Sequence, residues 1–257
     1  MKLKKTLKIV GITMLALLLL AVVVGVLDAL VGGGKWHFGW TDYRYDDTGY
    51  EVGEGSVIAD GITTIDVDWI DGSVEVVLCQ DRYISLTEKC DEMLTEEGKL
   101  HYRVSDDGKT LSVKYRASSW YLGSSKNKEK TLILRIPERM VDPAYLLENE
   151  LQPLNIKIKT VSGDVYVDAT PITRPNEGDQ PLSMVMNTLR VETKSGDVHL
   201  LLAKNSSFSL KFDSRRDETP AIGFDCTKKN GRYVCGDGDM KITVITKKGA
   251  LSVNPIK

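Results

Sequence analysis

The sequence predicts an all-β fold, a β-solenoid-like or sandwich-like stack of repeated strand pairs, preceded by one N-terminal transmembrane helix. Three observations lead to this prediction. An apolar run fills most of the first 31 residues, short alternating runs of apolar and polar residues fill much of the rest, and one glycine-centred pattern occurs four times. The 257 residues suffice for a single large β domain and an anchor.

The N-terminal segment has the composition of a membrane-spanning helix. Residues 9–31 are almost uninterruptedly apolar, and residues 1–8 contain four lysines. A helix of about 20 apolar residues crosses a bilayer, and basic residues keep their end of it in the cytoplasm. We expect a cytoplasmic tail at 1–8, a transmembrane helix at 9–31 and an extracytoplasmic remainder. A cleaved signal peptide is the alternative, although its apolar part is usually only about 7–15 residues long.

Residues 32–60 are expected to form a juxtamembrane linker. The segment begins with three glycines and then carries several aromatic residues, among them Trp36, Trp40 and Tyr43. Aromatic rings of this kind favour the headgroup layer of a membrane. A loop packed on the domain is the other interpretation. The all-β repeat domain is expected over residues 61–257.

Alternating apolar and polar residues predict the strands of this domain. The clearest runs are 73–78, 83–88, 100–104, 111–115, 131–136 and 208–212. Asp107-Gly108 and Asn230-Gly231 predict tight hairpins because such residues tolerate positive φ. One short helix is expected, in which Asp142 is the N-cap, Pro143 occupies the first position and Glu148 ends the run.

A repeated pattern is the most specific feature of the sequence. Relative to a central glycine, apolar residues lie at −7, −5, +2 and +4, and Thr or Trp lies at −3. The four central glycines are Gly72, Gly163, Gly196 and Gly249. Even offsets place the apolar residues of each strand on one face, and the glycine marks a turn between two strands. Asp164 and Asp197 directly follow two of these glycines and are expected to hold the turn by bonding local backbone.

Four cysteines are present, and two of them predict a disulfide. Counting outward from a two-residue turn at Asn230-Gly231 pairs Cys226 with Cys235 at a non-hydrogen-bonded position. The Cα atoms at such positions lie about 4.5 Å apart, which a disulfide accepts. Cys79 and Cys90 lack this symmetry. No Cys-x-x-Cys pair occurs, so zinc and thioredoxin-like sites are disfavoured.

The Thr-x-Ser-Gly-Asp-Val cores at residues 160–165 and 193–198 resemble the bacterial adhesin-like family of β-strand-repeat domains, a domain of unknown function. Residues 65–76 resemble the opening strand pair of that family, and residues 131–138 resemble its central strand. The likeness spans about residues 50–253. It implies a strand-rich fold, usually on anchored envelope proteins, and it implies no enzymatic activity.

No catalytic, metal or cofactor-binding site is predicted, and no small-molecule substrate is identified. His37, His101 and His199 are the only histidines, and no second ligand or catalytic partner lies at a suitable spacing. The Gly236–Asp239 tetrapeptide is similar to a calcium-binding turn, but a plain turn before a strand is the preferred interpretation. The formal charge of −2 argues against a nucleic-acid partner.

The sequence therefore favours a non-enzymatic, membrane-anchored cell-envelope protein, a binding or adhesin-like structural module. It would use exposed sheet faces or the long loop Thr170–Asn187 for contact. The expected partners are the cell membrane and either another membrane or envelope protein or a cell-wall polymer. Lysines at positions 126, 128, 130, 228 and 229 are expected in solvated turns or at strand edges, where they could touch an anionic wall polymer. The alternative function is an extracytoplasmic sensor or regulator of envelope stress, which would need a partner membrane protein because the cytoplasmic tail is so short.

Overall fold

The computed structural model describes residues 48–94, 96–115, 130–170, 185–216 and 218–256. All of them belong to one compact unit, Asp46–Lys257. The expected cytoplasmic tail, the transmembrane helix at 9–31 and most of the linker at 32–60 lie outside these ranges. Within these ranges, no helix combines the length and the apolar composition needed to span a bilayer.

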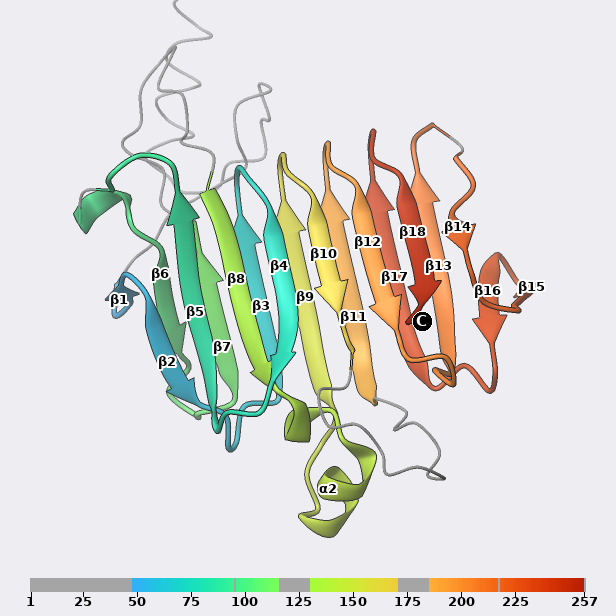
Figure 1. Cartoon of the computed structure of the whole chain (residues 1–257), viewed down its shortest axis with the longest axis horizontal. Helices are drawn as coiled ribbons and strands as arrows, with labels where there is room; N and C mark the ends of the chain where they lie inside the picture. The colour runs from blue at the N-terminus through green and yellow to red at the C-terminus, as the bar shows by residue number, and fades with distance from the viewer. Residues whose placement is uncertain (1–47, 95, 116–129, 171–184, 217, 257) are drawn as a thin grey trace, which may run out of the picture. The chain divides into compact units, whose positions relative to one another are not determined.

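Two sheets make up the described unit, and Figure 1 shows them as two layers of strands. The ten-stranded sheet contains, in spatial order, β1 (Glu51–Val52), β6 (His101–Val104), β7 (Thr110–Lys114), β3 (Thr64–Trp69), β9 (Leu154–Thr160), β11 (Met186–Thr193), β17 (Met240–Thr246), β13 (Phe208–Ser214), β16 (Arg232–Cys235) and β15 (Thr227–Lys229). The eight-stranded sheet contains β14 (Ala221–Ile222), β18 (Leu251–Pro255), β12 (Val198–Leu202), β10 (Val165–Asp168), β4 (Val74–Cys79), β8 (Lys130–Pro137), β5 (Tyr83–Cys90) and β2 (Gly55–Ile58).

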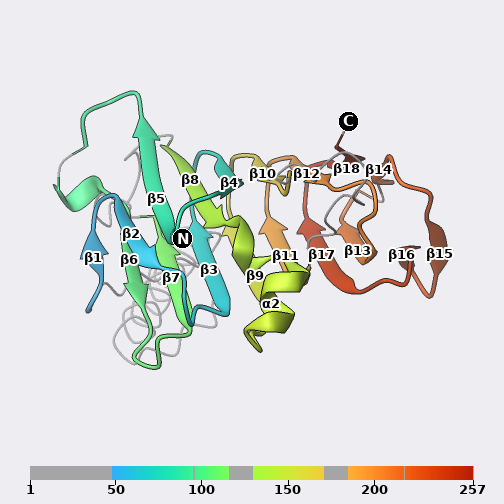
Figure 2. The same ribbon diagram turned by 60° about the horizontal axis from the view of Figure 1, so that its bottom comes forward.

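Each repeat contributes one strand to each sheet. The pairs are β3 with β4, β9 with β10, β11 with β12, and β17 with β18. Equivalent strands are parallel and in register, so that Ile156 pairs with Ile65 on one side and with Leu189 on the other. The repeats thus coil as in a solenoid, while the two sheets face each other as in a sandwich (Figure 2). The structure combines the two forms that the sequence left open.

The core lies between the two sheets and is built from the repeat positions. All sixteen apolar residues at offsets −7, −5, +2 and +4 are buried, and none exposes more than 3% of its surface. Burial of a Val, Leu or Ile side chain contributes about 1.5–3 kcal/mol. The two strands of each pair belong to the two facing sheets, so the apolar side chains of both sheets meet between them and form a continuous apolar layer.

The local signals agree with the observed elements in most cases. Each of the six predicted strands is present, with ends that differ by at most two residues. Helix α2 (Pro143–Glu148) begins as expected, because the Asp142 carboxylate accepts a hydrogen bond of 2.9 Å from the Ala144 amide. Two short 3₁₀ helices, η1 (Glu96–Gly98) and η2 (Glu138–Met140), are also present.

The two predicted hairpins differ. Asn230 and Gly231 have φ values of 50° and 73°, as a two-residue turn with both residues left-handed requires. The hairpin at Asp107-Gly108 is present and joins antiparallel β6 and β7, and the Gly108 amide donates to the Ser105 carbonyl at 2.8 Å. Its turn is not of the two-residue type, because only Gly108 has a positive φ. The Asp107 carboxylate instead accepts hydrogen bonds from the Ser105 hydroxyl and the Lys109 amide. These bonds stabilise a wider loop between β6 and β7.

The corners between paired strands set the spacing of the repeats. A Cβ atom at Gly163 would overlap the carbonyl of Gly72, and one at Gly249 would overlap the carbonyl of Gly196. Gly163 also has a φ of 102°, which side chains rarely adopt. The corners require glycine because the neighbouring repeat lies directly against them.

Replacing Gly249 by alanine tests the close approach of Gly249 to the Gly196 carbonyl without a contribution from backbone strain, because φ at Gly249 is not positive. We expect Gly249→Ala to lower the free energy of unfolding by about 3 kcal/mol or more, because the overlap can be relieved only by moving backbone. Gly108→Ala is the matched control, with a φ of 71° and open space around its Cβ position. It should cost only about 1 kcal/mol. Urea unfolding followed by tryptophan fluorescence measures both, and equal losses would contradict the stacking argument.

Candidate functional site

The repeat aspartates link one repeat to the next. The Asp164 carboxylate accepts a 2.8 Å hydrogen bond from the Asp197 amide, and the Asp197 carboxylate accepts one of 2.8 Å from the Ala250 amide. The expectation that these carboxylates bond the backbone of their own corner is therefore wrong. They act along the stack, because each accepts its hydrogen bond from the corner of the following repeat. Together with the glycines Gly72, Gly163, Gly196 and Gly249, they form a structural ladder.

Beneath the corners lies a second ladder at offset −3. Thr160, Thr193 and Thr246 occupy it and are buried, and Trp69 takes the equivalent place in the first repeat. The Thr246 hydroxyl accepts a 2.7 Å bond from the Gly249 amide. The Trp69 indole donates to the Lys130 carbonyl at 3.0 Å. These side chains fill the corner from inside and are not available to a ligand.

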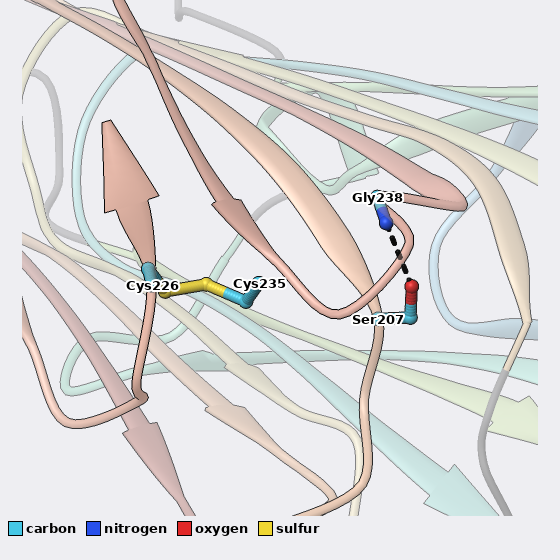
Figure 3. Close-up of a disulfide and its surroundings, with 4 residues drawn as sticks. All are labelled: Ser207, Cys226, Cys235 and Gly238. Atoms are coloured by element: carbon cyan, nitrogen blue, oxygen red, sulfur yellow. Dashed lines mark hydrogen bonds between the residues drawn. A yellow bond between two sulfur atoms is a disulfide. The ribbon is translucent and has the colours of Figure 1, made fainter. Parts of the chain in front are cut away.

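The hairpin of β15 and β16 carries a disulfide. Lys229 pairs with Arg232 and Thr227 with Val234, which sets Cys226 opposite Cys235. The two cysteines are joined, with a Cα–Cα distance of 4.3 Å (Figure 3). Cys79 and Cys90 are free thiols, and burial raises the pKa of Cys79.

The Gly236–Asp239 turn lies beside this hairpin and leads into β17. The Ser207 hydroxyl accepts a hydrogen bond of 2.8 Å from the Gly238 amide (Figure 3). It also accepts one of 3.2 Å from the Asp239 amide. Among the residues that the structure describes, no group of three His, Cys, Asp or Glu side chains could hold a metal ion. The turn fixes the start of β17 through backbone amides.

A buried ion pair caps the first repeat, and the sequence did not reveal it. The Lys130 ammonium lies 2.6 Å from the Glu88 carboxylate, with 1% and 3% of the side chains exposed. Lys130 also donates to the Gly98 carbonyl at 2.8 Å and lies 4.0 Å from the centre of the Tyr115 ring. The expectation that Lys130 is a solvated or edge residue is wrong, because it takes an inward-facing position at the start of β8. Lys126 and Lys128 lie outside the described residues.

The surroundings of this pair are unfavourable for an anionic side chain. Burial raises the pKa of Tyr115, and the nearby charges of Asp71 and Glu88 raise it further.

A pocket of about 360 Å³ opens beside the pair, lined by Glu54, Glu88, Cys90, Glu92, Leu94 and Lys99. The Glu54 carboxylate in this pocket already accepts a bond from the Glu88 amide at 3.0 Å. Two of the carboxylates that line the pocket, those of Glu54 and Glu88, thus already have partners in the protein that stabilise the end of the stack.

The outward face of the eight-stranded sheet presents exposed aromatic and aliphatic side chains. Tyr166 and His199 are neighbours on β10 and β12, with ring centres 4.7 Å apart and planes 13° from parallel. His199 Nδ1 lies 2.9 Å from the Ser252 hydroxyl, and the Tyr166 hydroxyl donates to Asp164 at 3.2 Å. Burial raises the pKa of Tyr166, and the Asp164 charge adds to the effect. Leu201, next to Asp168 in the register, is 38% exposed.

The outward face of the ten-stranded sheet is charged instead. Lys157 lies 3.4 Å from Asp66, and Arg190 lies 2.6 Å from Glu192. Burial raises the pKa of Asp68, an effect that the Lys159 ammonium opposes. The two faces of the stack therefore differ in chemistry: one presents exposed Tyr166 and Leu201 beside polar and charged residues such as Arg135, and the other presents mainly charged residues.

The remaining predicted residues do not come together. His101 is buried in β6 of the ten-stranded sheet, while His199 lies on the eight-stranded sheet. His37 and residues 171–184 of the long loop lie outside the described residues. The outward sheet faces are therefore the described surfaces that can receive a partner.

Comparisons with known proteins identify a family. A profile of the Toastrack DUF4097 family matches residues 62–216. No curated protein matches the sequence. A solved structure from Clostridium sporogenes, provisionally named a cell adhesion protein, is 13% identical, with a TM-score of 0.48 over 80% of this chain and 100% of that one. A provisionally named adhesin from Bacteroides fragilis is 12% identical, with a TM-score of 0.28 over 80% and 97%. Neither likeness bears on function at these scores.

Thiol labelling tests the disulfide. In chain taken from an oxidising compartment and denatured, we expect label on Cys79 and Cys90, and label on Cys226 and Cys235 only after reduction. The cysteines are nine positions apart, so closing this short loop contributes about 2–3 kcal/mol. The double variant Cys226→Ala/Cys235→Ala should lose about that much in urea unfolding. Label on both cysteines before reduction would refute the bridge.

The buried ion pair gives a second prediction. Lys130→Met should cost about 3–5 kcal/mol, because it leaves the Glu88 carboxylate buried and unpaired. The double variant Lys130→Met/Glu88→Leu should recover most of the loss. Lys99→Met, which breaks the exposed Lys99–Glu96 pair, is the control and should cost less than about 1 kcal/mol. Thermal and urea unfolding report all three, and a double variant no better than Lys130→Met would contradict this account.

Proposed function

The chain belongs to the Toastrack DUF4097 family, and we propose that it is a non-enzymatic binding module of the cell envelope, held at the membrane by residues 9–31. The observation that carries the proposal is the pair of outward sheet faces. Their side chains stand on parallel strands that the corner ladder holds in register. Such a scaffold presents side chains at fixed spacings to a partner, as recognition requires.

The membrane attachment is supported by the sequence. An apolar run of this length suits a bilayer, and four lysines precede it. The basic residues keep the N-terminus in the cytoplasm, so the β domain would lie outside the cell. An oxidising exterior also suits a cross-hairpin disulfide such as Cys226–Cys235.

The partners of the polar side chains support a non-enzymatic role. Asp164 and Asp197 bond backbone amides of the next repeat, Glu88 is paired with Lys130, and His199 contacts Ser252. Catalytic acids and bases need free access to a substrate proton. In this chain these groups have structural partners.

A second candidate function is a sensor or regulator of envelope stress. In this case a partner membrane protein would carry the signal. The exposed Tyr166 and Leu201 on the eight-stranded sheet suit a protein contact, because aromatic and aliphatic residues dominate such interfaces.

Membrane fractionation tests the attachment. We expect the chain to stay in membranes through alkaline carbonate washing, and external protease to cut after Gly34 in intact cells stripped of their wall. Release of the β domain with a new N-terminus near Gly32 would show a cleaved signal instead.

Site-specific crosslinking separates the two candidate functions. A photoreactive residue at Leu201 reports on the eight-stranded face, and one at Thr243 reports on the ten-stranded face. A binding module should yield envelope polymers or several products. One membrane protein, captured from Leu201 and absent from Thr243, would favour the sensor.

A further inference from the structure

The register of the ten-stranded sheet brings five basic residues from five strands into one lateral line. Arg190 pairs with Lys157 on one side and with Thr243 on the other, and Thr243 pairs with Lys211. Leu210 pairs with Tyr233, which places Lys211 beside Arg232, and Arg232 pairs with Lys229. We call Lys157, Arg190, Lys211, Arg232 and Lys229 the basic row. Five strand-to-strand steps of about 4.8 Å give it a length of about 24 Å.

The basic row faces outward and is only partly neutralised. Lys157 and Arg190 have side chains that are 48% and 45% exposed, and each has one acidic neighbour. Lys211 and Lys229 are exposed, and no described acidic side chain lies within ion-pair distance of them. Arg232 donates a hydrogen bond of 3.5 Å to the Ser209 hydroxyl, and among the described residues it forms no ion pair. The part of the basic row formed by Lys211, Arg232 and Lys229 is therefore a strip of positive charge without ion-pair partners among the described residues.

The rows on either side limit the width of this strip. Toward the corners, the next outward row carries the acids Asp68, Glu192 and Asp213, with Lys159 between the first two. Away from the corners, the next row contains Asn155, Thr188 and Ser209 and adds one more cation, Lys241. Along β11 and β13, Glu192 and Asp213 thus limit the positive charge on the corner side of the basic row.

This shape selects among anionic partners. A flat anionic membrane pressed on the face would bring its headgroups against Glu192 and Asp213 as well as against the basic row, and like charges repel. A single linear polymer can follow the basic row and avoid the acids. Guanidinium groups bind phosphate in a fork, and lysines on flexible stems adjust to the charge spacing of a chain.

We propose that the basic row binds a linear polymer of the envelope that carries phosphodiester groups along its backbone. This inference rests on the proposed function, since it names the ligand class of one outward face. Binding would release counterions from the polymer, so affinity would fall steeply with salt. For a flexible single strand, the slope of log K against log salt is about −0.7 per phosphate contacted, or about −3.5 for five contacts.

The test uses the purified full-length chain in neutral detergent, with fluorescent poly(glycerol phosphate) as the probe. Between about 50 and 200 mM NaCl we expect the affinity to fall about 100-fold, which corresponds to a slope of about −3.5. Lys211→Gln/Lys229→Gln should bring the slope to about −2 and weaken binding at every salt concentration. Lys247→Gln/Lys248→Gln is the matched control, because it removes the same charge from exposed lysines at the last corner. It should keep the wild-type slope.

Other results would overturn the proposal. If both double variants weakened polymer binding equally, only the net charge of the protein would matter. The N-terminal lysines are present in every variant, so they do not contribute to the difference between the two double variants. Phosphatidylglycerol vesicles that bind through the basic row when the polymer does not would assign it to a membrane surface. Inorganic phosphate that competes as well as the polymer, at equal phosphate concentration, would reduce the row to an ion site. If carbonate washing released the chain but the salt slope still depended on the basic row, only the proposed membrane attachment would be refuted.

Discussion

The contact of Gly163, Gly196 and Gly249 with the glycine carbonyl of the preceding repeat is the constraint on which the rest of the structure depends. Gly163 lies against Gly72, and Gly249 lies against Gly196, so closely that a Cβ atom would overlap the backbone. This approach keeps equivalent strands in lateral register in both sheets. Register in turn sets every repeat position on the buried side and every intervening residue on the outward side, since strand side chains alternate.

The ends of the stack need different solutions, because an open sheet edge or an open core would attract other chains. At the N-terminal end, Lys130 and Glu88 close the core above Trp69, and antiparallel strands extend both sheets. At the C-terminal end, the disulfide fixes β15 against β16 at the edge of the ten-stranded sheet. A buried ion pair contributes less to stability than apolar packing would. Here the pair closes a polar corner, where the Lys130 ammonium also meets the Gly98 carbonyl and the Trp69 indole.

The two outward faces are the functional consequence of this construction. The corner ladder makes them regular, and differences in sequence between repeats give them different chemistry. Exposed Tyr166 and Leu201 mark one face, and a basic row beside a row of mixed charge marks the other. Under the proposed function, a partner would be recognised by rows of side chains rather than in a cleft, and such rows suit extended partners better than small substrates.

The sequence by itself determined the features that depend on neighbours along the chain. The four glycine-centred repeats, the Asp142 cap of α2 and the two-residue turn at Asn230-Gly231 are all local, because periodicity, capping and turn chemistry act within a few residues. Only the tertiary structure decided what depends on residues far apart. Lys130 meets Glu88 across 42 positions, and the basic row collects residues from Lys157 to Arg232. Both arise from the way irregularly spaced repeats stack, and lateral register between distant strands leaves no signal in the spacing of the residues that it brings together.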